Sequence, residues 1–378
     1  MHYFKTFLEV AGTLIVLMSL IPLIRSDYWT FRVFEYPRLQ KLVLSVAVAG
    51  VYISLYFSAE LQTLLLSGAF VLNSIYLGYL IYPFTPLAGK VILTAEKHLP
   101  ESRVSILSSN VFQDNRNTAG CLNLIRKHDP DIVLLLETDS YWHTNTLALR
   151  DNYPYEVPVP LENTYGMLLY SKLALSEIQV RYLVDDEIPS IKTLVTLPSG
   201  KKVQLFCVHP TPPVPGENLH STERDKELLL VAKEVKASRL PCIVVGDLND
   251  VAWSYTTDLF TKISGLLDPR VGRGFYNTFH AKMPVLRFPL DHVFCSTDFK
   301  LVELARLENF SSDHFPILLS LQYEPAASIE QEEPEAEPED IALANEKIAK
   351  EPPLSPGKHL FLYSGVYTLT RRPCFAEL

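Results

Sequence analysis

The sequence predicts a helical membrane region followed by an α/β domain in which two β-sheets are flanked by helices. One observation behind this is the distribution of apolar residues, which are concentrated in the first 86 positions. The other is an alternation of short apolar strands and amphipathic helices over residues 97–323. Of the 378 residues, 48% are hydrophobic and 20% are charged, and the mean hydropathy is +0.11. This composition excludes a chain that is disordered throughout and favours a membrane-embedded part.

Three long apolar runs occupy residues 7–24, 42–57 and 61–81. A helix needs about 20 apolar residues to cross a bilayer, so each run is a candidate span, although the second is slightly short. A signal peptide is the alternative for the first run, but that run has no clear small-residue cleavage site and two more runs follow it. We therefore predict a multi-pass membrane region over residues 1–96, with about three transmembrane helices and the lipid bilayer as a partner.

Positive charges are unevenly distributed between the loops of this region. The first loop carries Arg25, Arg32, Arg38 and Lys41, whereas the second carries only Glu60. The positive-inside rule places the first loop in the cytoplasm, and with three spans it places everything after residue 86 there too.

Residues 97–323 form the predicted α/β domain. Strands are expected at 105–111, 131–138, 165–171, 241–249, 289–296 and 315–323, and a hairpin at 191–210. Helices are expected at 117–130 and 221–238. The mixture of hairpins and crossovers in this order predicts an α/β sandwich of two sheets.

Residues 324–378 are predicted to be an acidic, proline-rich, disordered tail. The run QEEPEAEPED at 331–340 contains few residues that could build a core. The tail carries much of the net charge of −9, and that charge argues against a broad basic nucleic-acid binder.

Polar residues follow or begin nearly every predicted strand of the α/β domain. They are Asn110, Glu137, His209, Asp247, Asn249, Asp291, Asp313 and His314. Carboxylate and amide oxygens suit a hard cation such as Mg²⁺ or Mn²⁺, and histidines suit phosphate contact or proton transfer. Each residue alone has a structural explanation as a turn, cap or surface residue. Together and in this order they fit the metal-assisted hydrolysis of a phosphate ester.

The motifs SSNV, LLLET, VHP, GDLND, LDHVF and SSDHFP occur in the order seen in the endonuclease/exonuclease/phosphatase superfamily. Residues 102–323 resemble this deoxyribonuclease I-like group, which also includes apurinic endonucleases, sphingomyelinases and inositol-phosphate 5-phosphatases. The resemblance implies a four-layer α/β sandwich and a Mg²⁺- or Mn²⁺-dependent hydrolase acting on ester bonds.

The resemblance also implies roles for matching residues. Glu137 would be the main metal ligand, Asn110 would help to position the metal or the phosphate, and Asp313 would lie near the metal. Arg224 matches a position where the family often places an arginine, although a solvated helix face would explain it nearly as well.

Five further residues would carry the catalytic steps. His209 would contact the phosphate or the leaving group, and Asp247 would orient or deprotonate the attacking water. Asn249 would donate to the transition-state oxyanion. Asp291 would orient the imidazole of His314, which would bind the scissile phosphate.

These expectations lead to a membrane-anchored phosphoesterase that acts on a phosphodiester or phosphomonoester, with a lipid-linked substrate as one option. An endonuclease acting on DNA or RNA is the alternative, which the acidic charge does not favour. A non-catalytic membrane scaffold of the same fold is the second alternative. The layout resembles bacterial inner-membrane proteins of this superfamily found near vancomycin and teicoplanin resistance. In those proteins the catalytic domain faces outward, whereas the positive-inside rule places it in the cytoplasm here. The sequence therefore does not assign the catalytic domain to one side of the membrane.

Overall fold

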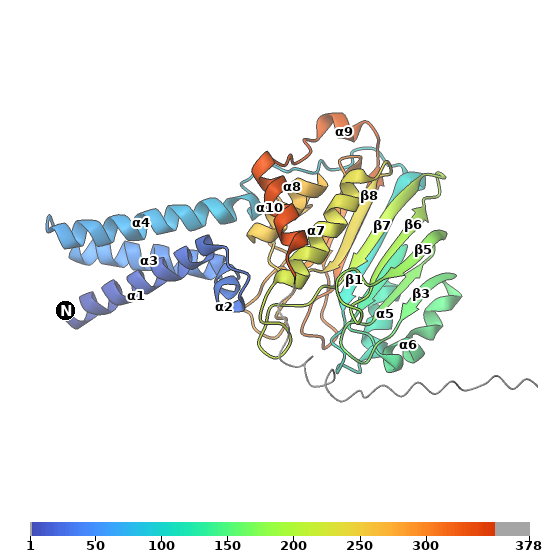
Figure 1. Cartoon of the computed structure of the whole chain (residues 1–378), viewed down its shortest axis with the longest axis horizontal. Coiled ribbons are helices and arrows are strands. Elements are labelled where there is room, and N and C mark those ends of the chain that lie inside the picture. The colour runs from blue at the N-terminus through green and yellow to red at the C-terminus, as the bar shows by residue number, and fades with distance from the viewer. Residues whose placement is uncertain (1, 352–378) are drawn as a thin grey trace, which may run out of the picture.

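Residues 2–351 are described by a computed structural model, in which a bundle of long helices projects from an α/β domain (Figure 1). The bundle consists of α1 (His2–Leu20), α3 (Arg38–Tyr56) and α4 (Leu61–Ile81), which all pack against one another. With the turns that extend α1 and α4, all three helices are long and apolar enough to cross a membrane. Short helical turns connect the bundle to the domain. They are η1 (Ile21–Ile24), α2 (Trp29–Arg32), η2 (Val33–Glu35) and η3 (Tyr82–Phe84).

The α/β domain contains two sheets that face each other. The strands of the six-stranded sheet, in spatial order, are β10 (Phe299–Arg306), β11 (Ile317–Tyr323), β1 (Arg103–Asn110), β2 (Ile132–Leu136), β4 (Met167–Ser171) and β3 (Tyr155–Val159). Those of the five-stranded sheet are β5 (Leu175–Arg181), β6 (Ser190–Thr196), β7 (Lys202–Val208), β8 (Cys242–Asp247) and β9 (Asp291–Cys295). Side chains such as Ile106 and Leu134 from one sheet and Leu205 and Ile243 from the other form the core between them.

Helices cover the outer face of each sheet. On the first sheet lie α5 (Thr118–His128) and α6 (Ser140–Thr146), followed by η5 (Leu147–Asp151). On the second lie α7 (Thr222–Ala237), α8 (Tyr255–Ser264) and α10 (Pro338–Ala349). The remaining elements are η4 (Pro100–Ser102) and α9 (Ala327–Glu330). The order helix, sheet, sheet, helix confirms the predicted four-layer sandwich.

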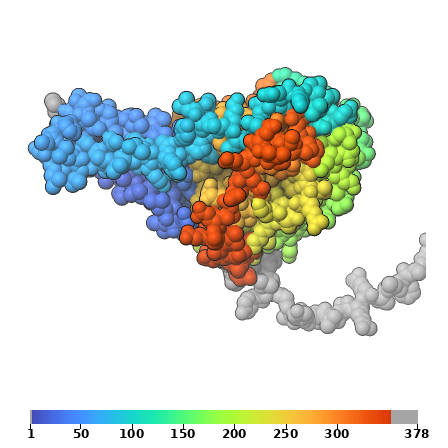
Figure 2. All heavy atoms as spheres, turned by 90° about the horizontal axis from the view of Figure 1, so that it is seen from above, coloured from blue at the N-terminus to red at the C-terminus, as the bar shows by residue number. Residues whose placement is uncertain are grey.

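The prediction of a disordered tail is wrong for residues 324–351. This segment forms α9 and α10, and Figure 2 shows it as a band across the face formed by α7 and α8. The physical reason is an apolar face on α10, which the acidic composition of the segment did not indicate. Ala344 is fully buried in the outer core, with Leu343 and Ile348 packed beside it. Glu337 and Asp340 form a capping box at the start of α10, so acidic residues here support a helix. The rest of the predicted tail, 352–378, lies outside the described residues.

Candidate active site

The sheet topology brings the polar strand ends to one edge of the sandwich. Strands β1 and β2 are parallel, as are β7 and β8, so each pair ends at a common edge. Asn110 ends β1, Glu137 follows β2, His209 follows β7 and Asp247 ends β8. Strand β9 runs antiparallel to β8 and begins at Asp291, which lies directly opposite Asp247. Residues far apart in the sequence therefore meet here.

The eight predicted site residues lie together at this edge, around a cavity of about 350 Å³. Six of them line it: Glu137, His209, Asp247, Asn249, Asp313 and His314. The other two contact these six, because Asn110 donates to Glu137 and Asp247, while Asp291 binds His314. The tertiary structure thus assembles every candidate that the sequence suggested.

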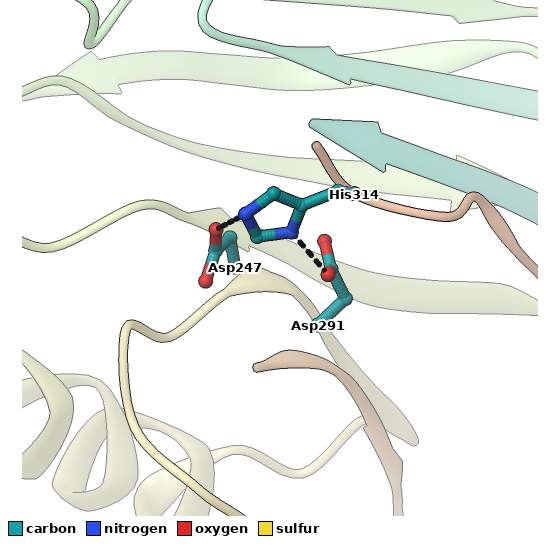
Figure 3. A group of neighbouring side chains, drawn as sticks. All are labelled: Asp247, Asp291 and His314. Carbon is teal, nitrogen blue, oxygen red and sulfur yellow. Dashed lines mark hydrogen bonds and ion pairs between the residues drawn. The ribbon is translucent and has the colours of Figure 1, made fainter. Parts of the chain in front are cut away.

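His314 lies between two buried aspartates (Figure 3). Its Nδ1 is 2.8 Å from Asp291 Oδ2, and its Nε2 is 3.6 Å from Asp247 Oδ2. Burial by itself would lower the pKa of His314, but the two carboxylates outweigh burial and raise the pKa to about 10. The imidazole is therefore protonated at neutral pH and presents a positive charge at the cavity.

Glu137 is held from two directions. Asn110 Nδ2 donates to Glu137 Oε1 at 2.7 Å and also to Asp247 Oδ2 at 3.1 Å, and the backbone N–H of Gln113 donates to Glu137 Oε2. Burial raises the pKa of Glu137 to about 7, although the bond from Asn110 opposes this. The oxygen of the Asn110 amide accepts from the N–H of Phe112, so Asn110 orients the two carboxylates. Its role as a metal ligand stays a prediction.

His209 differs from His314 although both are buried. Its ring packs beside Tyr165, with centroids 5.3 Å apart, and no hydrogen-bond partner of its Nδ1 lies within the described residues. Burial lowers the pKa of His209 to about 4, and the charge of Asp247 only partly opposes this. The site thus combines a neutral and a protonated imidazole, one able to accept a proton and one able to neutralise phosphate charge.

Backbone strain and close packing shape the loops that carry these groups. Glu137 and Asn249 adopt φ angles of 58° and 50°, in the left-handed region that non-glycine residues rarely occupy. Asn249 is held there by its own N–H, which donates to Asp247 Oδ1 at 2.9 Å. Gly246 precedes this loop, and a Cβ at that position would lie 1.8 Å from the carbonyl oxygen of Val208. Only glycine allows β7 and β8 to approach this closely beside Asp247.

The donor set fits a divalent cation. Within the described part of the chain, the only ion pair of Asp247 is with His314, and Glu137 has none. Glu137, Asp247 and Asp291 thus place three carboxylates around one charged imidazole, and a bound cation would offset the remaining negative charge. Ligand atoms of Asp247, Asp291 and His314 also lie within 4.8 Å of one another. A protonated imidazole cannot bind a metal, so Glu137 and Asp247 are the stronger candidates.

Several residues at this edge were not predicted from the sequence. Tyr165 and Phe279 line the cavity, and the Phe279 ring lies 4.9 Å from that of His314. Trp29 and Tyr36, from the segment between α1 and α3, line it as well. Arg224, for which a solvated helix face was an open alternative, is fully buried and donates to the carbonyl of Asn249 at 2.8 Å. Nothing in the local pattern of the apolar N-terminal region indicated a contribution to this site.

Comparison with known families identifies the fold. The sequence model of the Endonuclease/Exonuclease/phosphatase family matches residues 107–314, more than half of the chain. The chain belongs to this family. Members of the endonuclease/exonuclease/phosphatase family are hydrolases that act on phosphoester bonds with divalent metal ions. No curated protein sequence matches the chain.

Several solved structures of low sequence identity are similar to part of the chain. TDP2 from D. rerio, solved with a single-strand DNA product, is 18% identical; the match covers 58% of this chain and 99% of that one, with a TM-score of 0.49. The human nocturnin catalytic domain with bound sulfate is 17% identical, with coverage of 60% and 96% and a TM-score of 0.49. A mannosyl-6-phosphatase from Bacteroides thetaiotaomicron is 17% identical, with coverage of 58% and 100% and a TM-score of 0.43.

Proposed function

We propose that this protein is a membrane-anchored, divalent-metal-dependent phosphoesterase of the bacterial inner membrane. The observation that carries the proposal is a pair of carboxylates, the buried Asp247 and the partly buried Glu137, which face the cavity without a lysine or arginine partner among the described residues. A protonated His314 lies beside them. The carboxylates suit a metal cation, and the charged imidazole beside them suits a phosphate anion.

Glu137 would hold Mg²⁺ or Mn²⁺, with Asp313 close by and Asn110 keeping the carboxylate in place. The bound metal would polarise the phosphoryl oxygens and lower the barrier to attack by water. Asp247 would orient the water and accept its proton, and Asn249 would donate its amide to the developing oxyanion. His314, kept charged by Asp291, would neutralise a second phosphoryl oxygen. His209 would steady the leaving group.

We propose a lipid-linked phosphoester as the substrate. Much of the cavity wall is apolar, with Trp29, Val33, Phe279 and Leu290 on it together with a loop of prolines and valine at 212–215. Trp29 and Val33 come directly from the segment between two long helices that would lie in the bilayer. A substrate anchored in that bilayer would meet the site without leaving the membrane surface, with its apolar part against this wall.

The chemistry of the cavity lining does not favour a nuclease. Among the residues of 2–351 that line the cavity, Arg32 is the one arginine and there is no lysine, and Arg32 is already paired with Glu35 and Asp250. A nuclease groove presents free cations to the phosphate backbone. The non-catalytic scaffold is the remaining alternative, and a complete set of eight site residues in one place argues against it.

A substrate panel tests this function on the full-length protein in nanodiscs with Mg²⁺ or Mn²⁺. The substrates are a plasmid, a chromogenic phosphate diester, and phosphomonoester and phosphodiester lipids in the same bilayer. We expect turnover of a lipid substrate that is lost in Asp247→Asn. The control is Asp131→Asn, which should keep turnover, because the Asp131 carboxylate accepts from Ser105 of β1 and lies outside the cavity lining. Plasmid nicking that depends on Asp247 would favour the nuclease. No turnover by a folded, metal-loaded protein would favour the scaffold.

The side of the membrane needs a separate test, because the structure offers a second explanation for the charges of the first loop. Arg32 and Arg38 bind Asp250 and the carbonyl of Trp253 in the α/β domain, and Lys41 binds backbone carbonyls of Met18 and Phe34. These three cations therefore have structural partners independent of topology. A pair of reporter fusions to the C-terminus, one active only in the cytoplasm and one only outside it, assigns the side.

A further inference from the structure

The segment between α1 and α3, residues 25–37, lies against the α/β domain. The N–H of Trp29 donates to the carbonyl of Leu219 at 2.9 Å, and the carbonyl of Asp27 accepts from Ser221 at 2.8 Å. The side chains of Trp29, Arg32, Val33 and Tyr36 also line the candidate active-site cavity. This segment, hereafter the inter-helix segment, thus forms part of the cavity wall.

Tyr36 contacts the loop that carries a proposed catalytic residue. Its hydroxyl donates to the carbonyl oxygen of Asn249 at 2.8 Å. The same oxygen accepts from Arg224 Nη1, also at 2.8 Å, so one carbonyl is held by one donor from the inter-helix segment and one from α7. The Tyr36 ring packs edge-on against Phe288, with centroids 5.6 Å apart, which fixes its direction.

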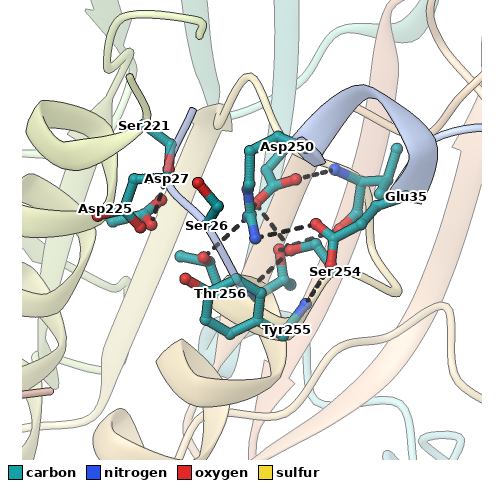
Figure 4. Close-up of polar contacts among 12 residues, drawn as sticks. Ser26, Asp27, Glu35, Ser221, Asp225, Asp250, Ser254, Tyr255 and Thr256 are labelled. Carbon is teal, nitrogen blue, oxygen red and sulfur yellow. Dashed lines mark hydrogen bonds and ion pairs between the residues drawn. The ribbon is translucent and has the colours of Figure 1, made fainter. Parts of the chain in front are cut away.

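Arg32 holds the next residue of the same loop. Arg32 Nη2 donates to Asp250 Oδ2 at 3.2 Å and to Thr256 Oγ1 at 3.0 Å, while Nη1 pairs with Glu35 at 3.1 Å. Asp250 Oδ2 also pairs with Arg224 at 3.0 Å. All of these groups are buried, and Figure 4 shows Glu35 of the inter-helix segment beside Ser254 and Tyr255, with Asp250 close by.

The network continues from the active-site loop to the C-terminal helix α10. Lys347 Nζ donates to Asp27 and to Asp225, at 2.8 Å in each case, and Arg224 binds Asp225 through two nitrogens. Figure 4 shows Asp27 beside Ser221 and Asp225. The inter-helix segment is therefore anchored at both of its ends, to α10 through Asp27 and to the active-site loop through Arg32 and Tyr36.

We propose that Tyr36 and Arg32 are positioning residues of the active site. Through them, the inter-helix segment contributes to catalysis. This inference rests on the proposed function. The two residues touch no reacting atom; they act through Asn249 and Asp250. Asn249 needs this support because its backbone is in the left-handed region, with φ of 50°, and its N–H must stay aligned on Asp247. The side-chain amide of Asn249 is held separately, because its Nδ2 donates to the carbonyl of Pro210 at 3.0 Å. The donors from the segment therefore act on the backbone of this loop, and without them the loop would carry the amide out of line with the oxyanion.

The experiment compares Tyr36→Phe with Tyr153→Phe in the full-length protein in nanodiscs. Tyr153 is a matched control, since its buried hydroxyl donates to a backbone carbonyl, that of Pro130, at 2.9 Å, away from the cavity. Both variants lose one phenolic hydrogen bond to a carbonyl. We expect similar small decreases in melting temperature, but a loss of kcat of about three- to tenfold in Tyr36→Phe alone, with KM changed less than about twofold. Equal kcat in the two variants would overturn the proposal.

A second pair tests the arginine. Arg32→Lys keeps the charge but cannot reach Glu35, Asp250 and Thr256 together, so its kcat should fall about tenfold. Arg150→Lys, which alters an exposed pair with Glu156, should keep wild-type kcat. A wild-type kcat in Arg32→Lys would contradict the role assigned to Arg32.

Hydrogen exchange separates failure of this inference from failure of the proposed function. If the wild type hydrolyses no substrate of the panel, the proposed function fails. The positioning role is then judged by the exchange rates of the amides over residues 248–251. Faster exchange there in Tyr36→Phe than in Tyr153→Phe supports positioning, and identical exchange in the two variants overturns it.

Discussion

Replacing Asp291 by asparagine removes the charge that does most to keep His314 protonated. Asp291 is buried at the start of β9, and its Oδ2 lies 2.8 Å from His314 Nδ1. Asparagine has nearly the same shape and can still bond the ring. The substitution therefore tests electrostatics with little change in packing.

The two buried histidines show how strongly neighbouring carboxylates can change the pKa of an imidazole. The pKa of His314 is raised to about 10, whereas burial lowers that of His209 to about 4. Removing one opposite charge at this distance lowers a pKa by roughly 1–3, which places the pKa of His314 in the variant between about 7 and 9. Asp247, at 3.6 Å, keeps it from falling further. In the wild type, the charged imidazole contributes stability that is lost as the pH rises toward about 10. In the variant, the same contribution would be lost at a lower pH.

The assay is kcat as a function of pH from 6 to 10 at saturating Mg²⁺. We expect the wild type to lose activity only near the upper end, because His314 deprotonates there. In Asp291→Asn the loss should begin about 1–3 pH units earlier, so the defect should be small at pH 6 and at least about tenfold at pH 9. Asp131→Asn, which removes a carboxylate bonded to Ser105, should keep the wild-type profile. An unshifted profile in Asp291→Asn would refute the reasoning.

Three other substitutions test the metal site, the contacts of helix α10 and the close packing of β7 against β8. Loss of an outer-shell partner weakens metal binding about 10- to 100-fold, so Glu137→Gln, which alters the proposed ligand itself, should weaken Mn²⁺ binding at least about tenfold by calorimetry, unlike Glu156→Gln. Wild-type affinity should rise with pH through about 7 as Glu137 ionises. Lys347→Met should cost about 3–5 kcal/mol in chemical unfolding because Asp27 and Asp225 lose a buried cation. Lys350→Met, half-exposed, should cost about 0–1 kcal/mol, and equal costs would count against the buried network. Gly246→Ala should cost more than about 4 kcal/mol because its Cβ meets the Val208 carbonyl, whereas Gly50→Ala, which has open space, should fold normally.

Most elements of the core were predictable from local sequence. The buried strands β2, β4 and β8 are continuous apolar runs, and the structure confirms the hairpin of β6 and β7 at its predicted place. Strands β5 and β10 were not predicted, because they are partly exposed edge strands with weak apolar patterns. Strand β3, whose pattern is interrupted by Pro158, and the helices α6 and α8 were not predicted either.

The candidate site was predictable only where it coincides with strand ends. A charged residue directly after a buried strand, such as Glu137 or Asp247, stands out against the apolar run before it. Tyr36 and Arg32 have no such signal, because they lie in a short connection between two apolar helices. Tyr36 is separated from its partner Asn249 by 213 positions. Arg224 was ambiguous because an exposed and a buried face of an amphipathic helix can both carry arginine.

The sequence by itself determined the order of the layers, the membrane-like character of the first 84 residues and the identity of the groups at the strand ends. The apolar spans and the strand-and-helix pattern depend on local periodicity, which each segment carries alone. The four-layer order and the roles of the strand-end groups came from the order of the motifs and the family that they resemble. Tertiary structure decided what surrounds these groups: which histidine is charged, which carboxylates lack a lysine or arginine partner, and that the inter-helix segment and α10 hold the active-site loop. The physical reason is that a pKa, a buried ion pair or a cavity wall depends on neighbours in space, and here those neighbours come from opposite ends of the chain.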